Sequence, residues 1–315
     1  MSFIAIFLAL LLEQARPLGE NNPMHAGIRA WTGWVRRSFD AGQKGHGWLS
    51  WTMGAALPAL ASSVIYWLLL EWSLLLALLW LVLVLYATLG FRQFSHHFTA
   101  IRDALEEGDE PRARDLLAKW QEVDVNDLPR QEVLRHVIEH SVLAAHRHVF
   151  GVLVAFAVFA WLGLGPAGAV LYRCAEYLAR AWQSRGEEVC SEALQQAAGR
   201  AWQVLDHVPS RMTALSFAVV GNFEEAVACW RQDASGPQVS NEAVVLAATA
   251  GAINVRLGGK PLGGVSLPEE AELSTPTDGR EPQMAHLASV VGLVWRSVVL
   301  WLLLLALMLL ASWLG

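Results

Sequence analysis

The carboxyl end of the chain is a long segment that carries no charge. Residues Ser297 to Gly315 read SVVLWLLLLALMLLASWLG and are almost wholly apolar. A helix needs about 20 such residues to cross the hydrocarbon core of a bilayer. A second apolar region, Trp51 to Phe91, has room for two crossings, and its only polar break is Glu71-Trp72-Ser73. Two regions of this length are not expected in a soluble core, so the sequence predicts an integral membrane protein.

The composition excludes some classes of function. Of the 315 residues, 54% are hydrophobic and only 17% are charged. The net charge of −6, with no basic cluster, speaks against nucleic-acid binding. The three cysteines, Cys174, Cys190 and Cys229, include no CxxC pair, which argues against a disulfide framework and a thiolate metal site. We therefore expect the lipid bilayer, and no nucleic acid, among the partners.

The alternation of polar and apolar stretches predicts an all-α fold: a polytopic helical integral membrane protein with a membrane-adjacent helical polar region. The expected regions are a half-inserted N-terminal helix, a polar loop and a transmembrane hairpin (1–91), a helical region (92–260), a flexible linker (261–286) and a C-terminal transmembrane helix (287–315). Segments 14–50 and 92–148 carry Lys and Arg, so the positive-inside rule places both in the cytoplasm. The expected location is the bacterial inner membrane, crossed several times.

Residues 149–173 form an apolar segment with a break in its middle. The sequence Gly163-Leu-Gly-Pro-Ala-Gly168 interrupts it with residues that end helices. Broken helices occur at membrane depth where their backbone is buried in protein or lines a cavity. Two interpretations stay open: one plain crossing, or a re-entrant pair of helices that returns to the same side.

Four motifs follow one another between residues 90 and 260. They are Ala104-Leu105 with Gly108-Asp109 and Ala113-Arg114, then Gly165-Pro-Ala-Gly-Ala-Val-Leu-Tyr-Arg173, then Val208-Pro-Ser-Arg-Met212, and last Asn241 with Ala250-Gly-Ala-Ile-Asn-Val-Arg-Leu-Gly-Gly259. In this order they resemble the CobD/CbiB family, membrane adenosylcobinamide-phosphate synthases of cobalamin biosynthesis. The resemblance implies an enzyme that joins an amine to a carboxylate at the expense of ATP. ATP and Mg²⁺ are implied only if that activity is retained.

The chain departs from this family where the synthases have polar residues. Family members have Glu-Asn-Thr-Val-Asp-Gly before the apolar segment, whereas this chain has His146-Arg-His-Val-Phe-Gly151. After the Tyr-Arg pair they have Asn-Thr-Leu-Asp, whereas this chain has Glu176-Tyr-Leu-Ala179. Two expected carboxylates are thus replaced, by Phe150 and Ala179. Carboxylates serve such chemistry by holding a metal ion and moving protons, so their loss argues against the synthase reaction.

A further stretch is similar to a related branch. Val204-Leu-Asp-His-Val-Pro-Ser-Arg211, followed by Ala218-Val-Val-Gly221, looks like AmpE, an inner-membrane protein linked to β-lactamase regulation. The lead hypothesis is therefore a divergent, AmpE-like member with a regulatory or envelope-related role. The alternative is an adenosylcobinamide-phosphate synthase. Asp206 and Arg211 flank Pro209; a structural ion pair between them is the favoured interpretation, and a role in the site is the alternative.

The ligand-binding candidates come from the matched motifs and from charges beside the broken segment. They are His146, Arg147, His148, Tyr172, Arg173, Asn241 and Arg256. Such side chains could bind an anionic group, for example a phosphate or a lipid head, or could simply snorkel at the membrane edge. The implied partners are a small anionic ligand or a corrinoid, and a membrane protein or a second copy of the chain. One shared site would need 92–148 and 174–260 on one face of the membrane, which favours the re-entrant pair.

One short motif invites a metal. His136-Val-Ile-Glu-His140 matches the H-x-x-E-H pattern of inverted zincins. Histidines at i and i+4 share a helix face and can both reach one Zn²⁺, with Glu139 as a base. The competing interpretation is a polar helix near the membrane surface with hydrogen-bonded histidines. A metal-binding membrane protein using His136, Glu139 and His140 is thus the second alternative function.

Overall fold

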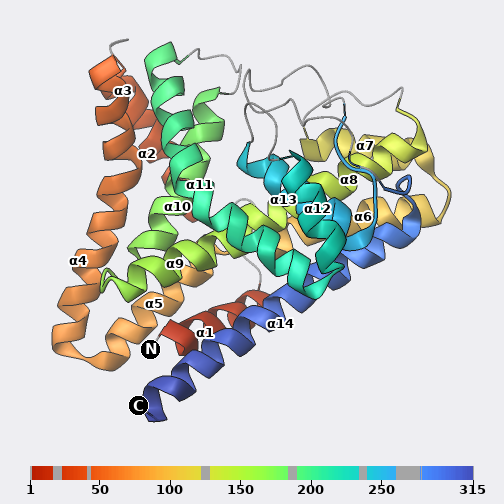
Figure 1. The fold of residues 1–315 in the computed structure, drawn as a ribbon. Helices are drawn as coiled ribbons and strands as arrows, with labels where there is room; N and C mark the ends of the chain where they lie inside the picture. Colours follow the sequence, from red (N-terminus) through yellow and green to blue (C-terminus); the bar gives the residue numbers. More distant parts are fainter. Residues whose placement is uncertain are drawn as a thin grey trace. The chain divides into compact units, whose positions relative to one another are not determined.

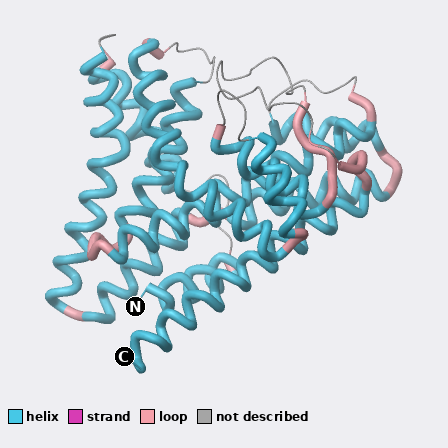
Figure 2. Tube along the Cα trace, viewed as in Figure 1, coloured by secondary structure: helices cyan, strands magenta, loops and turns pink. Residues whose placement is uncertain are grey.

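The computed structural model describes residues 2–16, 23–40, 44–121, 128–183, 190–233, 240–259, 277 and 279–314. Figure 2 shows helices and loops, and no strand, in these residues. The helices, labelled in Figure 1, are α1 (Ser2–Ala15), α2 (Pro23–Phe39), α3 (Lys44–Trp51), α4 (Leu57–Trp72), α5 (Leu74–Thr88), α6 (Phe91–Glu106), α7 (Glu110–Gln121), α8 (Arg130–Ala145), α9 (Gly151–Trp161), α10 (Ala167–Gln183), α11 (Glu192–Val220), α12 (Phe223–Asp233), α13 (Asn241–Ile253) and α14 (Met284–Leu314). The predicted all-α fold is confirmed.

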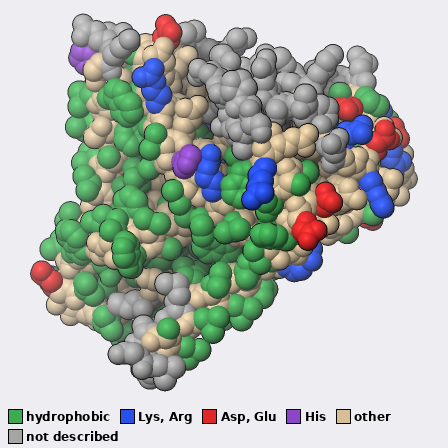
Figure 3. Space-filling view, viewed as in Figure 1, with side chains coloured by type: hydrophobic (Ala, Val, Ile, Leu, Met, Phe, Trp, Pro, Cys, Tyr) green, Lys and Arg blue, Asp and Glu red, His purple; other side chains and the backbone are tan. Residues whose placement is uncertain are grey.

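Three continuous helical stretches are long and apolar enough to cross a membrane. They are Gly45–Trp72, Arg130–Trp161 and Met284–Leu307. Figure 3 shows many hydrophobic side chains on the visible surface, and on α4 Leu60 and Leu68 are both more than half exposed. Leucines exposed in such numbers are expected to face lipid. The chain is therefore a helical membrane protein, and the number and orientation of its crossings stay predictions.

Two helical hairpins have local causes in the sequence. Between α4 and α5, the extended residue Ser73 caps α5 by accepting a hydrogen bond from the backbone N–H of Leu75 (3.3 Å). Between α9 and α10 the chain reverses through Gly163 and Gly165, whose φ angles of 79° and 57° favour glycine. Gly168 lets the two helices touch, since a Cβ there would lie 2.1 Å from the Ala155 carbonyl oxygen.

This reversal decides part of the question about residues 149–173. The segment is not one straight helix: α9 ends at Trp161 and α10 packs back against it. A return to the same side of the membrane remains a prediction. The helix before the break is longer than expected, because α8 and α9 join through a π-helical turn, η2 (His146–Phe150), into the stretch Arg130–Trp161.

Other boundaries differ from those expected. The predicted polar loop within 14–50 contains α2 and α3, because its glycines and arginines lie among enough apolar residues to form helices. The helix pair around Gly108 is confirmed as α6 and α7, with Gly108 at φ 77°. The predicted linker 261–286 lies largely outside the described residues, and α14 begins at Met284 rather than residue 287.

The helices form two compact units, each made of two separate pieces of chain. The first unit is Met1–Gln93 with Arg147–Pro209, and the second is Phe94–His146 with Ser210–Gly315. In the first unit α10 packs on α4, α5 and α9, while in the second α13 packs on α8, α12 and α14. Contacts within each unit therefore join segments that are distant along the chain.

Candidate functional site

Three of the predicted ligand residues lie on one irregular turn. His146, Arg147 and His148 belong to the π-helical turn η2, inside an otherwise α-helical stretch. Such a turn leaves main-chain carbonyls out of the regular ladder, and it occurs often at functional sites. Here the carbonyl of His148 accepts a hydrogen bond from the backbone N–H of Gly90 (3.3 Å). The π-helical turn thus interrupts the regular α-helix at the three polar residues His146, Arg147 and His148.

The first unit contains a buried carboxylate held by two arginines. Glu176 of α10 is only 3% exposed, and its Oε2 lies 2.9 Å from Nη1 of Arg173. Its other oxygen forms an ion pair with Arg180, which comes from the next turn of the same helix. Counted by themselves, these three side chains carry a net positive charge. Arg180 keeps 46% of its side chain exposed, so an anion can reach this charge.

Tyr172 lies beside this charge and forms a second buried contact. Its hydroxyl donates a hydrogen bond to Oδ1 of Asp206 (2.7 Å), a residue of α11 that is 1% exposed. Burial, followed by the negative charge of Asp206, raises the pKa of Tyr172 well above 10, and the charge of Arg147 opposes this shift. The phenol is therefore protonated at neutral pH. Gly151 allows the approach, because a Cβ there would lie 2.0 Å from the Tyr172 oxygen.

Glu176 and Asp206 are carboxylates in a unit where two carboxylates expected from the family motif are replaced. Phe150 and Ala179, which stand at the family's carboxylate positions, are both buried apolar residues. Two other carboxylates are nevertheless present in the same unit, one on α10 and one on α11. The sequence analysis did not select Glu176. Its position three residues after Arg173 and four before Arg180 was the available signal, because residues at these spacings share a helix face.

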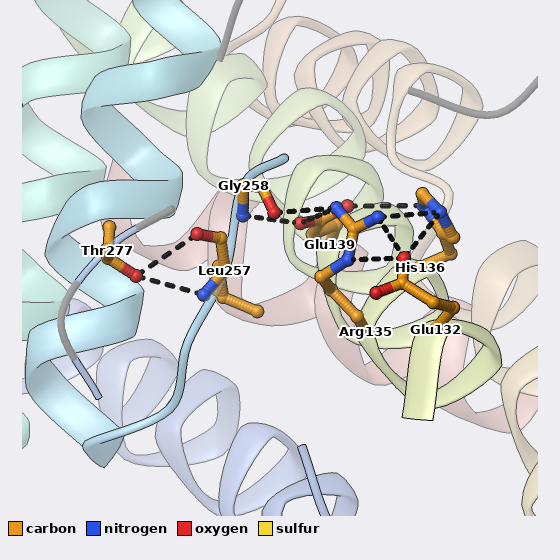
Figure 4. A network of polar contacts seen from close by, with 7 residues as sticks. All are labelled: Glu132, Arg135, His136, Glu139, Leu257, Gly258 and Thr277. Carbon is orange, nitrogen blue, oxygen red and sulfur yellow. Dashed lines mark hydrogen bonds and ion pairs between the residues drawn. The ribbon is translucent and has the colours of Figure 1, made fainter. Parts of the chain in front are cut away.

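In the second unit, a polar network joins α8 to the segment that follows α13 (Figure 4). Arg135 donates to Oε1 of Glu139 (3.2 Å) and to the carbonyl of Gly258 (2.8 Å). The N–H of Gly258 donates in turn to the same Glu139 oxygen (2.7 Å). Both main-chain groups of Gly258 are thus bound by one buried ion pair. Glu132 forms a further ion pair with Arg135 on the other side of the guanidinium.

The same network includes two of the three residues, His136, Glu139 and His140, that were considered as metal ligands. His136 Nδ1 lies 3.3 Å from Oε2 of Glu139, but the guanidinium of Arg135 also contacts both residues. His140 is held elsewhere, with its ring edge-on to Trp120 at 4.4 Å between centroids. A cation would have to displace Arg135, so these residues do not fit a metal site. Among the described residues, no group of three or more His, Cys, Asp or Glu is arranged to hold one.

The remaining predicted residues also lie in the second unit. Asn241, the first residue of α13, accepts a hydrogen bond at Oδ1 from Nη1 of Arg211 (2.7 Å). His146 Nδ1 lies 2.9 Å from the hydroxyl oxygen of Thr213 and is fully buried. Arg256 is exposed, and its backbone N–H donates to the carbonyl of Arg280 (2.8 Å). Asp206 binds the Tyr172 hydroxyl and Arg211 binds Asn241, and the ion pair expected between Asp206 and Arg211 stays a prediction.

The predicted site residues are therefore divided between the two units. Arg147, His148, Tyr172 and Arg173 lie in the first unit, which also holds Glu176 and Asp206 beside Tyr172 and Arg173. His146, Asn241 and Arg256 lie in the second unit. One pocket that contains all seven residues remains a prediction.

These features define a class: an all-α membrane protein with arginine–carboxylate clusters buried among its helices. Comparison with known proteins then identifies the family. A family model described as CobD/Cbib protein matches residues 4–294. The chain belongs to the CobD/CbiB family.

Relatives of similar length support this assignment. The cobalamin biosynthesis protein CobD of Stutzerimonas stutzeri is 32% identical over 308 residues, covering 96% of each chain. The protein of the same name from Chromobacterium violaceum is 32% identical over 305 residues, covering 94% of each. One from Leptospira interrogans is 27% identical over 185 residues, covering 56% of each. No solved structure matches the chain. Because these relatives carry the CobD name, they favour the synthase alternative, and nothing in them supports the AmpE-like regulatory role.

Proposed function

We propose that this protein acts in cobalamin biosynthesis as an adenosylcobinamide-phosphate synthase, joining an amine to a carboxylate of a corrinoid at the expense of ATP. The observation that carries the proposal is similarity to proteins named CobD along nearly the whole chain. The main objection was the loss of two carboxylates from the family pattern. The buried pair Glu176 and Asp206 meets this objection, because it supplies two carboxylates beside the Tyr172-Arg173 motif.

The charges of the first unit suggest roles for its residues. Arg147, Arg173 and Arg180 fit anionic groups, either the phosphates of ATP or a phosphate on the other substrate, because guanidinium binds phosphate in a charge-assisted, two-point manner. Mg²⁺ is held in such enzymes by one or two carboxylates and by the substrate's own phosphates. Asp206, which accepts from the Tyr172 hydroxyl, and Glu176, which is paired with two arginines, are the two candidates for this. ATP would supply the free energy of amide formation.

The proposal also includes a location and a topology. The three candidate membrane helices and the family suggest a multi-pass protein of the bacterial inner membrane. ATP is a cytoplasmic compound, so the polar ends of α8 and α10 would face the cytoplasm. This agrees with the positive-inside rule as applied to residues 92–148.

Complementation tests the proposed activity. The chain is expressed in a bacterium that lacks its own cobinamide-phosphate synthase, and growth is scored under conditions that require cobalamin made from cobyric acid. We expect rescue by the unchanged chain and loss of rescue with Glu176→Gln, which keeps the shape but removes the charge. Glu192→Gln, at the exposed start of α11, is the matched control and should rescue fully. Failure of the unchanged chain, with the protein confirmed in the membrane, would refute the proposal and return attention to the regulatory hypothesis.

A further inference from the structure

The last turns of α11 carry an exposed row of large apolar side chains. Met212, Leu215 and Val219 are 39%, 42% and 52% exposed, and Phe223 at the start of α12 is 52% exposed. Spacings of three and four residues place the first three on one face of the helix. Apolar rows of this kind mark contact with another protein or with lipid. Yet α11 is not among the helices long and apolar enough to cross a membrane.

A contact with α14 indicates how deep in the bilayer this row lies. The indole N–H of Trp301 donates a hydrogen bond to the hydroxyl of Ser216 (2.8 Å), which lies within the row's turns of α11. Trp301 belongs to the candidate membrane span Met284–Leu307, five residues after the exposed Arg296. At a rise of 1.5 Å per residue, Trp301 lies about 8 Å beyond that charge along the helix. Trp301 also lies six residues, about 9 Å, from the Leu307 end of that span, so its contact indicates that Ser216 lies at the level of the outer acyl chains.

The charges around the row agree with this level. No charged residue occurs between Arg211 and Glu224. The guanidinium of Arg211, at the start of this uncharged stretch, is bound to Asn241, so it does not lie on the exposed row. The hydroxyl of Ser216 also donates to the carbonyl of Met212 (2.7 Å), so the polar atom within the row is satisfied internally.

We infer that the face of α11 formed by Met212, Leu215 and Val219 lies against the acyl chains of the bilayer, with α11 as an interfacial helix that does not cross. The occupant is lipid rather than a second copy of the chain, because Ser216 within the row is bound to Trp301 of the candidate membrane span, and Val299 and Leu303 of that span are themselves exposed. Interfacial helices bury their apolar face about 5–10 Å into the boundary between headgroups and acyl chains, which matches the depth of Trp301.

Spin labelling tests this inference. Single cysteines replace Met212, Leu215 or Val219 in the full chain, which is labelled and placed in lipid nanodiscs. Collision rates are then measured with oxygen, which partitions into acyl chains, and with a water-soluble nickel chelate. Gln196→Cys, on the exposed polar start of the same helix, is the matched control. The native cysteines are buried. Labelling the parent chain, which has no added cysteine, measures any reaction at these native positions.

We expect the ratio of oxygen to nickel collisions at the three row positions to exceed the control by about tenfold or more, since a charged chelate is excluded from hydrocarbon. A ratio equal to the control would show that the row faces water and would overturn the inference. Low collision rates with both reagents, together with short distances between labels on two chains, would show that a second copy covers the row and would overturn it equally. Neither result depends on the proposed synthase activity.

Discussion

The clearest energetic prediction concerns Glu139, whose carboxylate joins α8 to the segment after α13. Glu139→Ala removes the acceptor of the buried Gly258 N–H and one partner of Arg135, which is 7% exposed in its side chain. Breaking a buried ion pair from one side destabilises a protein by about 3–5 kcal/mol. Arg135 keeps its ion pair with Glu132, so we expect the lower end, about 3 kcal/mol.

Thermal unfolding of the detergent-solubilised chain measures this loss. For a cooperative unit of 150–250 residues, 1 kcal/mol shifts Tm by about 2–4 °C, which predicts a fall of about 6–12 °C. Glu139→Gln retains a neutral acceptor for Gly258 and should lose only about 1–2 kcal/mol, the difference between charged and neutral hydrogen bonds.

The matched control is Glu106→Ala in the same unit. Glu106 is 60% exposed in its side chain and lies 3.6 Å from Arg102, so its loss should change Tm by no more than about 2 °C. If Glu139→Ala behaves like this control, the buried pair does not hold the Gly258 segment, and the argument from burial is refuted.

The other predictions concern close contacts and one thiol. Gly151→Ala should abolish rescue of growth, because its Cβ would lie 2.0 Å from the Tyr172 oxygen; full rescue would contradict this packing. Gly168→Ala should lower Tm through the 2.1 Å approach to Ala155, and an unchanged Tm would mean that α9 and α10 are less tightly packed. Burial raises the pKa of Cys174 from 9.0 to about 11, so the unfolded chain releases this proton first and stability should fall as pH rises from 9 to 11. Cys174→Ala should remove up to about 2–3 kcal/mol of that loss, seen as a smaller drop in Tm between pH 8 and pH 11; an equal drop in both chains would argue against the buried thiol.

The features that the sequence predicted well are those encoded locally. The turn at Gly108 and the hairpin at Ser73 follow from residues that end or cap helices where they stand. The amphipathic helix α2 was not predicted, because its glycines resemble those of a loop. The helix also packs against α3, and this contact is not visible in its own sequence.

The candidate site shows the same division between local and distant information. Tyr172 and Arg173 were selected because they stand in a recognisable motif, and their role in a functional site stays a prediction. Glu176 was missed because the search followed the family's carboxylate positions rather than charges that share a face of α10. The metal hypothesis for His136 used spacing along one helix, but the partner that makes Arg135 and Glu139 structural is Gly258, which is distant in the chain.

The interleaved composition of the two units has a consequence for synthesis. Glu139 belongs to the early piece of the second unit and Gly258 to the late piece. The ribosome adds about 5–20 residues per second, so Gly258 is made about 6–24 s after Glu139. During that interval Arg135 and Glu139 have each other but not the peptide that they bind in the finished protein. The contact between Glu139 and Gly258 can therefore form only after residue 258 is made, when the first unit already has both of its pieces.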